Sequence, residues 1–191
     1  MIIGITGGSG CGKTTLLTVI EEMGGLILDC DAIYHGLLQT DSSLLEAIEA
    51  RFSGTVRGGV LDRKALGNIV FAEEAALADL NRITHSAVRA EVLRLLAVQP
   101  QLAAIDAIGL FEGDLATLCD VTITVTAPEE DRVRRLMERD GITEDYAKKR
   151  IAAQHPESWF REKCDYALQN DGTQAQFREK CLAFLHSLDI M

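Results

Sequence analysis

The 191-residue sequence predicts an α/β fold in which a parallel β-sheet is covered by helices on both faces. Short apolar runs, typical of buried strands, occur at residues 2–6, 26–29, 102–108, 120–126 and 164–169. Segments of helical periodicity lie between them, and strands that alternate with helices favour parallel pairing. Hydrophobic residues make up 47% of the chain, which is enough to bury one core.

The helices are indicated by apolar spacing and by end signals. Residues 16–23 form the first helix. A helix over residues 42–52 has Ser43 and Glu46 at capping-box spacing, and Asp62 is expected to cap the next helix. Further helices are expected at residues 86–98, 128–141, 143 onward and 173–188.

The stretch from residue 35 to residue 98 is mostly helical and carries no strong strand signal. It is too long for a simple crossover between two strands of one sheet. We therefore expect it to build a second lobe over the carboxyl edge of the sheet, so that the chain is one domain with an insertion.

The composition restricts the partners of the chain. The formal net charge is −10, so most of the surface would repel a nucleic-acid backbone, and positive charge should be concentrated at a site. No basic-then-apolar leader follows Met1, and no apolar run has bilayer length. The five cysteines form no C-x-x-C pair, which favours a reducing cytoplasm. We expect a cytoplasmic monomer or weak homo-oligomer that acts on a small molecule, without nucleic-acid or membrane partners.

The stretch GITGGSGCGKTT, residues 4–15, carries the strongest signal. From Gly7 to Thr14 it fits G-x-x-x-x-G-K-[ST], the phosphate-binding loop. In such a loop the backbone N–H groups form a nest for phosphate oxygens, and the following helix points its free N–H groups at the same place. A glycine-rich turn without a ligand is the alternative, but the strand–loop–helix context favours a nucleotide site.

The motif assigns roles to most of its residues. Lys13 is expected to contact the terminal phosphates of a nucleotide, and the Thr14 hydroxyl suits a ligand of Mg²⁺. ATP and Mg²⁺ are therefore the expected cofactors. The residues predicted to bind the nucleotide are Gly8, Ser9, Gly10, Cys11, Gly12, Lys13, Thr14 and Thr15.

Carboxylates follow two of the predicted strands. Asp29 and Asp31 come at the end of the second strand, and parallel sheets bind ligands outside the carboxyl ends of their strands. Asp31 is expected to accept the proton of an attacking hydroxyl or to help hold Mg²⁺, unless it only caps the following helix. Asp106 is a weaker candidate for a water-mediated Mg²⁺ contact, and a turn role explains it equally well.

Arginines recur along the charged helix near residue 135. Arg132, Arg135 and Arg139 have i, i+3 and i+7 spacing and share one face, while Arg134 points elsewhere. Two interpretations are open: a solvated face paired with its own acids, or a lid that brings guanidinium groups to a transferred phosphoryl group. We expect Arg135 and Arg139 to be the functional pair.

Cys11 stands inside the phosphate loop, where serine would be ordinary. The loop amides, the helix N-terminus and Lys13 favour a thiolate, so one hypothesis is a reactive thiol that bound Mg·ATP protects. The other hypothesis is that Cys11 replaces a serine and turns its side chain away from the nest.

A series of motifs spans nearly the whole chain; in order, they are GITGGSGCGKTT, the D-x-D of Asp29 and Asp31, GGVLDRKALGNIVF, LNRITH, IDAIGLFE, RRLMERDGIT, RIAAQ and CDYALQNDG. In this series the chain resembles the dephospho-coenzyme A kinase family. The resemblance implies transfer of the γ-phosphoryl group of ATP to the 3′-hydroxyl of dephospho-CoA. It also implies a three-layer P-loop kinase core with an inserted helical substrate domain and a helical lid.

The resemblance further implies site residues and boundaries. The implied catalytic residues are Asp31 as general base, Lys13 and Arg139. Arg135 and Asn170 join the nucleotide site, and the acceptor side comprises Asp31, His35, Arg63, His85 and Glu112. The implied core is 1–34, 99–134 and 162–191, with an acceptor-binding insertion at about 35–98 and a lid at about 135–161.

The chain departs from the family pattern mainly on the acceptor side. The family usually has arginine at His35, proline at Ser86, Pro-Leu at Ile108 and Gly109, and glutamine at Arg132. Another P-loop kinase that acts on a nucleoside or nucleotide is therefore the alternative function. A regulatory nucleotide-binding module is less favoured, because the chain has no N-K-x-D-like guanine-reading motif.

Overall fold

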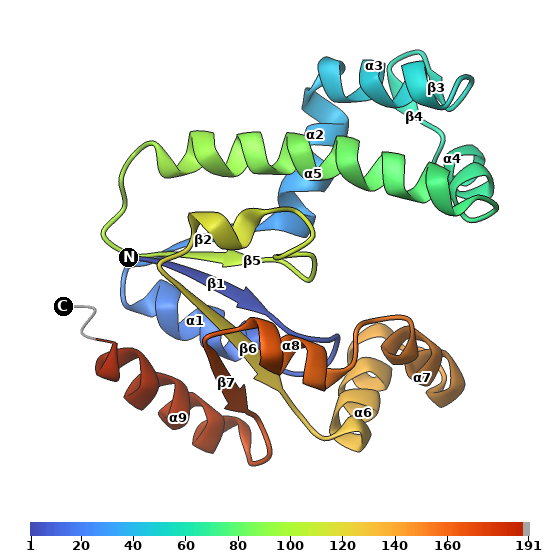
Figure 1. Ribbon diagram of the computed structural model, residues 1–191. Coiled ribbons are helices and arrows are strands. Elements are labelled where there is room, and N and C mark those ends of the chain that lie inside the picture. The colour runs from blue at the N-terminus through green and yellow to red at the C-terminus, as the bar shows by residue number, and fades with distance from the viewer. Residues whose placement is uncertain (189–191) are drawn as a thin grey trace. The chain divides into compact units, whose positions relative to one another are not determined.

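A computed structural model describes residues 1–188 and divides into two compact units (Figure 1). The first unit contains Met1–Leu28, Gln99–Leu110 and the chain from Leu115 onward. The second unit contains Asp29–Val98 and Phe111–Asp114. The phosphate loop therefore belongs to the first unit, and the expected acceptor-side residues belong to the second.

Among residues 1–188, five strands form one sheet in the order β2-β5-β1-β6-β7. They are β1 (Ile2–Thr6), β2 (Leu26–Asp29), β5 (Ala103–Asp106), β6 (Val121–Thr126) and β7 (Tyr166–Gln169). β1 pairs in parallel with β5 and β6, and β6 pairs in parallel with β7. Each strand lies in a predicted apolar run, so the predicted parallel α/β fold is confirmed. Because β1 is central, the phosphate loop leaves the sheet beside the carboxyl ends of β5 and β6.

The first unit packs helices against this sheet. They are α1 (Lys13–Glu22), the 3-10 helix η1 (Leu115–Leu118), α6 (Glu129–Asp140), α7 (Glu144–Ala152), α8 (Glu157–Lys163) and α9 (Gln174–Ser187). α1 and α9 lie side by side on one face, where Leu16 and Phe177 join Ile5 in the core (Figure 1). On the other face of β1, a Cβ at Gly4 would lie 2.8 Å from Cys119 Sγ, so the segment around η1 packs closely there.

The second unit has a helical core of its own. It contains α2 (Cys30–Thr40), α3 (Ser42–Arg51), α4 (Arg63–Val70), α5 (Glu74–Leu96) and a short hairpin of β3 (Val56–Arg57) and β4 (Val60–Leu61). Apolar side chains at helical spacing meet in one buried cluster, which comprises Leu38, Leu44, Leu45, Ile48, Phe52, Leu66, Val70 and Ala76.

The structure corrects three local expectations in the second unit. The hairpin was not expected, although its turn residues Gly58 and Gly59, with φ of 59° and 77°, are a recognised hairpin signal. α3 is capped by Asp41, whose Oδ1 accepts from the Ser43 N–H at 2.9 Å, and not by Ser43. α5 begins at Glu74, well before the predicted start at residue 86, because its first turns pack on α2, α3 and α4.

Two other predicted helix starts are confirmed. The Asp62 side chain accepts from the Ala65 N–H and caps α4, and the Thr143 hydroxyl accepts from the Tyr146 N–H and caps α7. These caps satisfy N–H groups that the first turn of a helix leaves without partners. End signals in the sequence therefore located both helices correctly.

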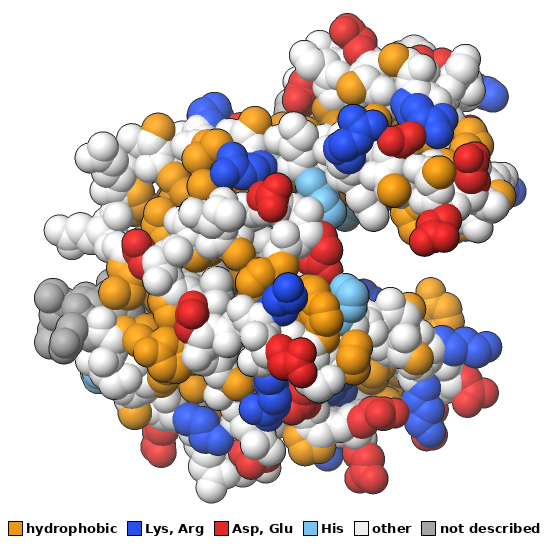
Figure 2. Space-filling model, viewed as in Figure 1, with side chains coloured by type: hydrophobic (Ala, Val, Ile, Leu, Met, Phe, Trp, Pro, Cys, Tyr) orange, Lys and Arg blue, Asp and Glu red, His pale blue; other side chains and the backbone are white. Residues whose placement is uncertain are grey.

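The surface mixes charges of both signs. On the face shown in Figure 2, Lys and Arg side chains stand among Asp and Glu side chains and do not gather into a continuous basic surface. No helix within residues 1–188 is both long and apolar enough to cross a bilayer. The cations that matter for the candidate site are few, and they lie around the phosphate loop.

Candidate active site

The phosphate loop connects β1 to α1 and depends on three glycines with positive φ. Gly7, Gly10 and Gly12 have φ of 131°, 79° and 98°, conformations that other residues rarely adopt. Gly12 immediately precedes α1, so the start of the helix depends on this conformation. The glycine spacing of the motif is therefore a requirement of the backbone path.

The loop presents backbone donors without acceptors. Two of its amides bond locally, from Cys11 to Gly8 O at 3.3 Å and from Thr15 to Gly12 O at 3.1 Å. The Lys13 amide faces the Cys11 sulfur. Three others donate to no group within residues 1–188; they are the amides of Gly10, Gly12 and Thr14. No side chain caps α1, which leaves its positive dipole end open to an anion. This arrangement suits a phosphate group.

Lys13 lies against the loop. Its Nζ donates to Gly7 O at 3.0 Å and lies 4.0 Å from Asp106 Oδ1. The Lys13 and Asp106 side chains are only 14% and 18% exposed, so this ion pair is less screened than one on the surface. Thr14 is exposed in the first turn of α1. The structure thus brings the expected phosphate-binding lysine close to the weaker of the two carboxylate candidates.

Two arginines of α6 reach the loop. Arg132 Nε donates to Ser9 O at 2.9 Å, and Arg135 Nη1 donates to Gly10 O at 3.1 Å and to Cys11 O at 3.4 Å. Both guanidinium groups are partly buried, so their charges are felt more strongly than those of solvated arginines. They add two positive charges beside the unpartnered amides.

The other two arginines of this run bind carboxylates. Arg139 forms a two-point contact with Asp140, at 2.6 and 2.9 Å, and Arg150 binds the same carboxylate at 2.7 Å. This hydrogen bonding raises the pKa of Arg139 and lowers the pKa of Asp140. Arg134 pairs with Asp131 at 2.7 Å and is 62% exposed. The structure does not bring Arg139 to the loop, and its catalytic role stays a prediction.

Asn170 follows β7 and supports the loop from the opposite end of the chain. Its Nδ2 donates to Cys11 O at 2.9 Å. The residue is 5% exposed, and its Oδ1 has no hydrogen-bond partner within residues 1–188. A Cβ at Gly12 would collide with the side-chain amide of Asn170, so this side chain packs directly on the loop backbone. Asn170 therefore lies at the predicted nucleotide site, and its contact with a nucleotide stays a prediction.

The hypothesis of a reactive Cys11 is wrong. Cys11 is 1% exposed, and its side chain belongs to the core cluster that contains Ile5 and Val125. Burial raises the pKa of the thiol and outweighs the nearby charges of Lys13 and Arg132, which lower it. The alternative holds: Cys11 turns its side chain away from the nest and contributes to the loop through its backbone.

Sequence reasoning missed two contributors to the loop, Gln154 and Arg132. Gln154 Oε1 accepts from the Ser9 N–H, and Gln154 Nε2 donates to Ser9 Oγ, both at 2.8 Å. The available signal was the RIAAQ stretch that ends at Gln154. Arg132 lies on the arginine face that the sequence singled out, but the expected pair was Arg135 and Arg139.

In the second unit, the two acids of the D-x-D motif differ in their contacts. Asp29 ends β2 and caps α2, where its Oδ1 accepts from the Ala32 N–H at 3.0 Å. Asp31 lies in the first turn of α2, is exposed, and forms no hydrogen bond or ion pair with the described residues of its unit. Because the helix begins between them at Cys30, Asp29 belongs to the end of the strand and Asp31 to the helix. Asp29 is the capping residue, which leaves Asp31 available for another role.

The other acceptor-side candidates also lie in this unit. Arg63 Nη2 lies 3.3 Å from His35 Nδ1. Burial raises the pKa of neighbouring Tyr34, and the Arg63 charge opposes this shift. His85 is half-buried on α5, and Glu112 is exposed within Phe111–Asp114. His35, which stands where the family usually has arginine, thus lies beside Arg63, another residue expected on the acceptor side.

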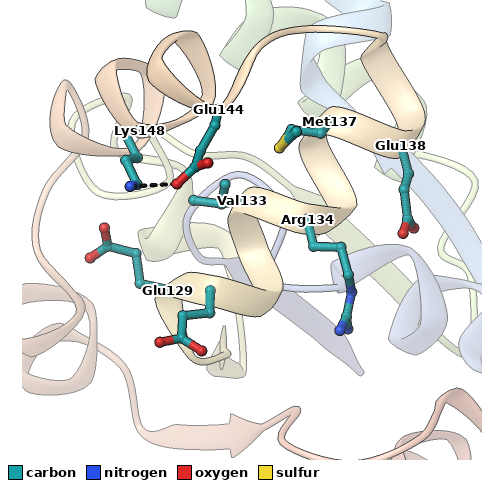
Figure 3. Close-up of a pocket in the computed structure, with 8 residues that line it drawn as sticks. Glu129, Val133, Arg134, Met137, Glu138, Glu144 and Lys148 are labelled. Carbon is teal, nitrogen blue, oxygen red and sulfur yellow. Dashed lines mark ion pairs between the residues drawn. The ribbon is translucent and has the colours of Figure 1, made fainter.

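A hollow of about 790 Å³ lies between α6 and α7 (Figure 3). Neither Arg132 nor Arg135 lines it. It is lined by Glu129, Glu130, Val133, Arg134, Met137, Glu138, Glu144 and Lys148. Glu144 and Lys148, one turn apart on α7, form an ion pair at 2.6 Å along one wall of it. No residue of the phosphate loop lines this hollow, so it is separate from the candidate nucleotide site.

Comparison with known proteins places this site in a family. The family model for dephospho-CoA kinase matches residues 1–176. The chain belongs to the dephospho-CoA kinase family. Related dephospho-CoA kinases include one from Latilactobacillus sakei, 34% identical over 97% of this chain and 95% of the relative. Another, from Anaeromyxobacter dehalogenans, is 37% identical over 90% of this chain and 84% of the relative.

Solved structures agree with the family. A crystal structure of a Thermus thermophilus protein has a TM-score of 0.81 and 32% identity, and covers 98% of this chain and 97% of its own. The dephospho-CoA kinase from Campylobacter jejuni has a TM-score of 0.69 and 26% identity, covering 98% of this chain and 96% of its own. A shikimate kinase from Bacteroides thetaiotaomicron, at 17% identity and a TM-score of 0.57 over 99% and 98% of the chains, shows the fold alone. The P-loop kinase fold expected for this family of ATP-dependent kinases is therefore confirmed.

Proposed function

We propose that this member of the dephospho-CoA kinase family transfers the γ-phosphoryl group of ATP to the 3′-hydroxyl of dephospho-CoA, which gives coenzyme A and ADP. The observation that carries the proposal is the row of unpartnered loop amides beside Lys13 and Arg135, in a chain that matches the family along most of its length. The amides and cations support the ATP half of the reaction. Family membership supports the acceptor half.

On the ATP side, the chain binds phosphates and stabilises their charge. The amides of Gly10, Gly12 and Thr14 bind phosphate oxygens, and the Lys13 ammonium exchanges Gly7 O for the terminal phosphates. Arg135 keeps the loop backbone in place and adds positive charge, and Asn170 holds Cys11 O. Because phosphoryl transfer needs little covalent chemistry from the protein, positioning and electrostatics account for most of its acceleration.

The residues near Lys13 fit a magnesium ion. The Thr14 hydroxyl would be the protein ligand, and Asp106 would hold a water bound to the ion. Mg²⁺ commonly uses one or two protein oxygens together with phosphates and waters, so a separate carboxylate cluster is not required. Within residues 1–188 there is indeed no group of three or more His, Cys, Asp or Glu suited to a metal. When bound, the ion neutralises charge on the β- and γ-phosphates.

On the acceptor side, Asp31 is the general base. Its carboxylate is exposed and has no partner in its own unit, so it can accept the proton of the 3′-hydroxyl as that oxygen attacks the phosphorus. His35, Arg63, His85 and Glu112 bind the acceptor. Among them, Arg63 suits the diphosphate of dephospho-CoA, because a guanidinium binds phosphate oxygens at two points.

Arg139 acts in the same proposal as the residue that stabilises the transferred phosphoryl group. It reaches that group by exchanging the Asp140 carboxylate, which it now holds at 2.6 and 2.9 Å, for phosphate oxygens. A planar guanidinium suits both partners, since each offers two oxygens. Arg139 can leave Asp140 for phosphate oxygens only when a nucleotide is bound, so the Arg139–Asp140 contact is the one expected without nucleotide.

The proposal includes a division of the chain and a location. The core comprises 1–34, 99–134 and 162–191, the acceptor-binding insertion about 35–98, and the lid about 135–161. The protein works in the cytoplasm as a monomer or weak homo-oligomer, without a nucleic-acid partner. Free cysteines, including the buried Cys11 and Cys30, agree with a reducing compartment.

An acceptor panel tests the function. The protein is incubated with Mg·ATP and dephospho-CoA, adenosine, AMP or shikimate, and ADP release is followed together with the mass of the product. Dephospho-CoA should gain one phosphate with a kcat/KM at least about a hundredfold above the other acceptors. Preference for adenosine or AMP would instead indicate a nucleoside or nucleotide kinase with a diverged acceptor site.

A further inference from the structure

Ser9, in the first half of the phosphate loop, is bonded at each of its polar groups. Its carbonyl accepts from Arg132 Nε at 2.9 Å. Its N–H donates to Gln154 Oε1 and its Oγ accepts from Gln154 Nε2, both at 2.8 Å. Arg132 Nη2 also lies 3.4 Å from Gln154 Oε1, so the two side chains form one network. Ser9 is 8% exposed beneath them.

The glycines on either side of Ser9 make this contact possible. A Cβ at Gly8 would collide with the Arg132 guanidinium and lie 3.2 Å from Gln154 Oε1. A Cβ at Gly10 would lie 2.6 Å from the backbone oxygen of Arg132. The loop therefore packs directly on α6, backbone against backbone, with the guanidinium over Gly8.

We propose that Arg132 and Gln154 are positioning residues of the phosphate loop, a role that rests on the proposed ATP site. They fix Ser9, and through it they hold the following residues in the conformation whose amides converge on a phosphate. Gly10 and Gly12 would otherwise have wide conformational freedom. The entropy lost when they become ordered would then weaken the affinity for ATP. Neither side chain needs to touch ATP, because both act on Ser9.

The hydrogen-bond pattern favours this role over a purely electrostatic one. A positive charge near the nest could come from any cation. Here, however, one guanidinium donates from Nε to Ser9 O and from Nη2 to Gln154 Oε1. Gln154 is neutral and makes two of the three bonds to Ser9. An electrostatic role would not involve Gln154.

The first experiment uses Arg132→Ala and Gln154→Ala. For each, the affinities for ATP and ADP are measured by calorimetry without acceptor, and hydrogen exchange is followed in the peptide covering residues 4–15. We expect each substitution to weaken nucleotide binding about tenfold and to speed amide exchange in the loop. KM for ATP should rise by a similar factor, while KM for dephospho-CoA stays within about twofold. Arg134→Ala is the matched control, because Arg134 lies on the same helix and pairs with Asp131, and it should bind nucleotide like the wild type.

A second set separates geometry from charge. Arg132→Lys keeps the charge but cannot reach Ser9 and Gln154 together, so it should lose most of the affinity that Arg132→Ala loses. Gly8→Ala should displace the guanidinium and weaken ATP binding as Arg132→Ala does. The double variant Gly8→Ala/Arg132→Ala should then be no worse than either single variant, since both remove the same contact.

Wild-type nucleotide affinity and loop exchange in Arg132→Ala and Gln154→Ala would overturn the proposal. Full activity of Arg132→Lys, or additive losses in the double variant with Gly8→Ala, would overturn the geometric role as well. If the wild type fails to phosphorylate dephospho-CoA, the proposed acceptor is wrong. The positioning role is still decided in that case, because its binding and exchange measurements contain no acceptor.

Discussion

The first unit bonds three of its candidate residues to the phosphate loop, whereas the second unit leaves its main candidate exposed. Lys13, Arg135 and Asn170 each donate to a backbone oxygen of the loop, and the loop amides that should bind phosphate already lie together. The Asp31 carboxylate, by contrast, bonds to none of the described residues of its unit. The difference indicates that the proposed ATP site is preorganised, whereas the proposed base, Asp31, has no partner within its own unit. Predictions for the two units should therefore separate ATP binding from transfer.

The largest expected effect comes from Asp31→Asn. Loss of a general base should lower kcat by at least about a hundredfold. The dissociation constant for ATP should change by less than about twofold, because the residues that bind ATP lie in the first unit and keep their contacts. Calorimetry with ATP and a coupled assay with dephospho-CoA measure the two quantities. Near-normal turnover would show that Asp31 is not the base.

The next effect concerns two arginines of α6 that differ in their present contacts. Arg139→Lys and Arg139→Ala should both lower kcat by roughly tenfold or more, because an ammonium cannot reproduce the two-point contact of a guanidinium. Arg135→Ala should instead raise KM for ATP, since Arg135 already supports the loop backbone. Steady-state kinetics with varied ATP separates the two patterns. A lysine variant as active as the wild type would mark Arg139 as part of a solvated helix face.

A smaller effect is expected within the second unit, at Glu49. Its carboxylate accepts from the Gly54 and Val56 N–H groups, both at 2.6 Å, and these bonds lower its pKa. A lowered pKa in the folded state stabilises the protein above the ordinary glutamate pKa of about 4.3 and stops doing so as the pH falls through the lower value. Glu49→Gln should melt about 2–4 °C below the wild type at pH 7, and the difference should shrink at pH 3.

The control for Glu49 lies in the other unit. ATP affinity at pH 7 should be the same in Glu49→Gln and in the wild type, because the loop contacts belong to the first unit. Equal melting temperatures of Glu49→Gln and the wild type at pH 7 would show that the Glu49 carboxylate does not stabilise the β3–β4 hairpin. A weakened ATP affinity would contradict the separation of the two units.

The smallest effect is expected at Cys11. Because its thiol is buried and its pKa is raised, alkylation of the native protein at neutral pH should leave Cys11 unmodified, with or without Mg·ATP. Cys11→Ser should keep turnover within about twofold of the wild type. Peptide mapping after alkylation, with an unfolded sample as the positive control, measures the labelling. Rapid labelling that Mg·ATP blocks would restore the hypothesis of a reactive loop thiol.

The fold was predictable because its signals are local. Apolar runs fixed each strand of the sheet, and the glycines of the loop revealed a backbone path that no other residue adopts easily. The Gly-Gly turn of the hairpin was equally local and was overlooked, because the flanking apolar pairs are only two residues long.

The contacts to the loop were not predictable in the same way. Arg132 and Gln154 lie 123 and 145 residues from Ser9, and helical spacing shows which arginines share a face but not which of them meets another element. For that reason Arg132 was passed over in favour of Arg139. The division of roles between Asp29 and Asp31 also depended on where β2 ends and α2 begins, a boundary that sequence patterns locate only to within a few residues.

The attachment of Ser9 determines how the segment between Arg132 and Gln154 can move. The backbone of α6 at Arg132 touches the loop at Gly10, and Gln154, two residues past the end of α7, is bonded to Ser9. The segment between Arg132 and Gln154, called the flap here, is therefore attached to the loop at both ends, at Gly10 and at Ser9. While those fastenings last, it cannot swing away about a single hinge and has to pivot near each attachment. Gly141, with φ of 65°, ends α6 and sets the turn that leads to α7.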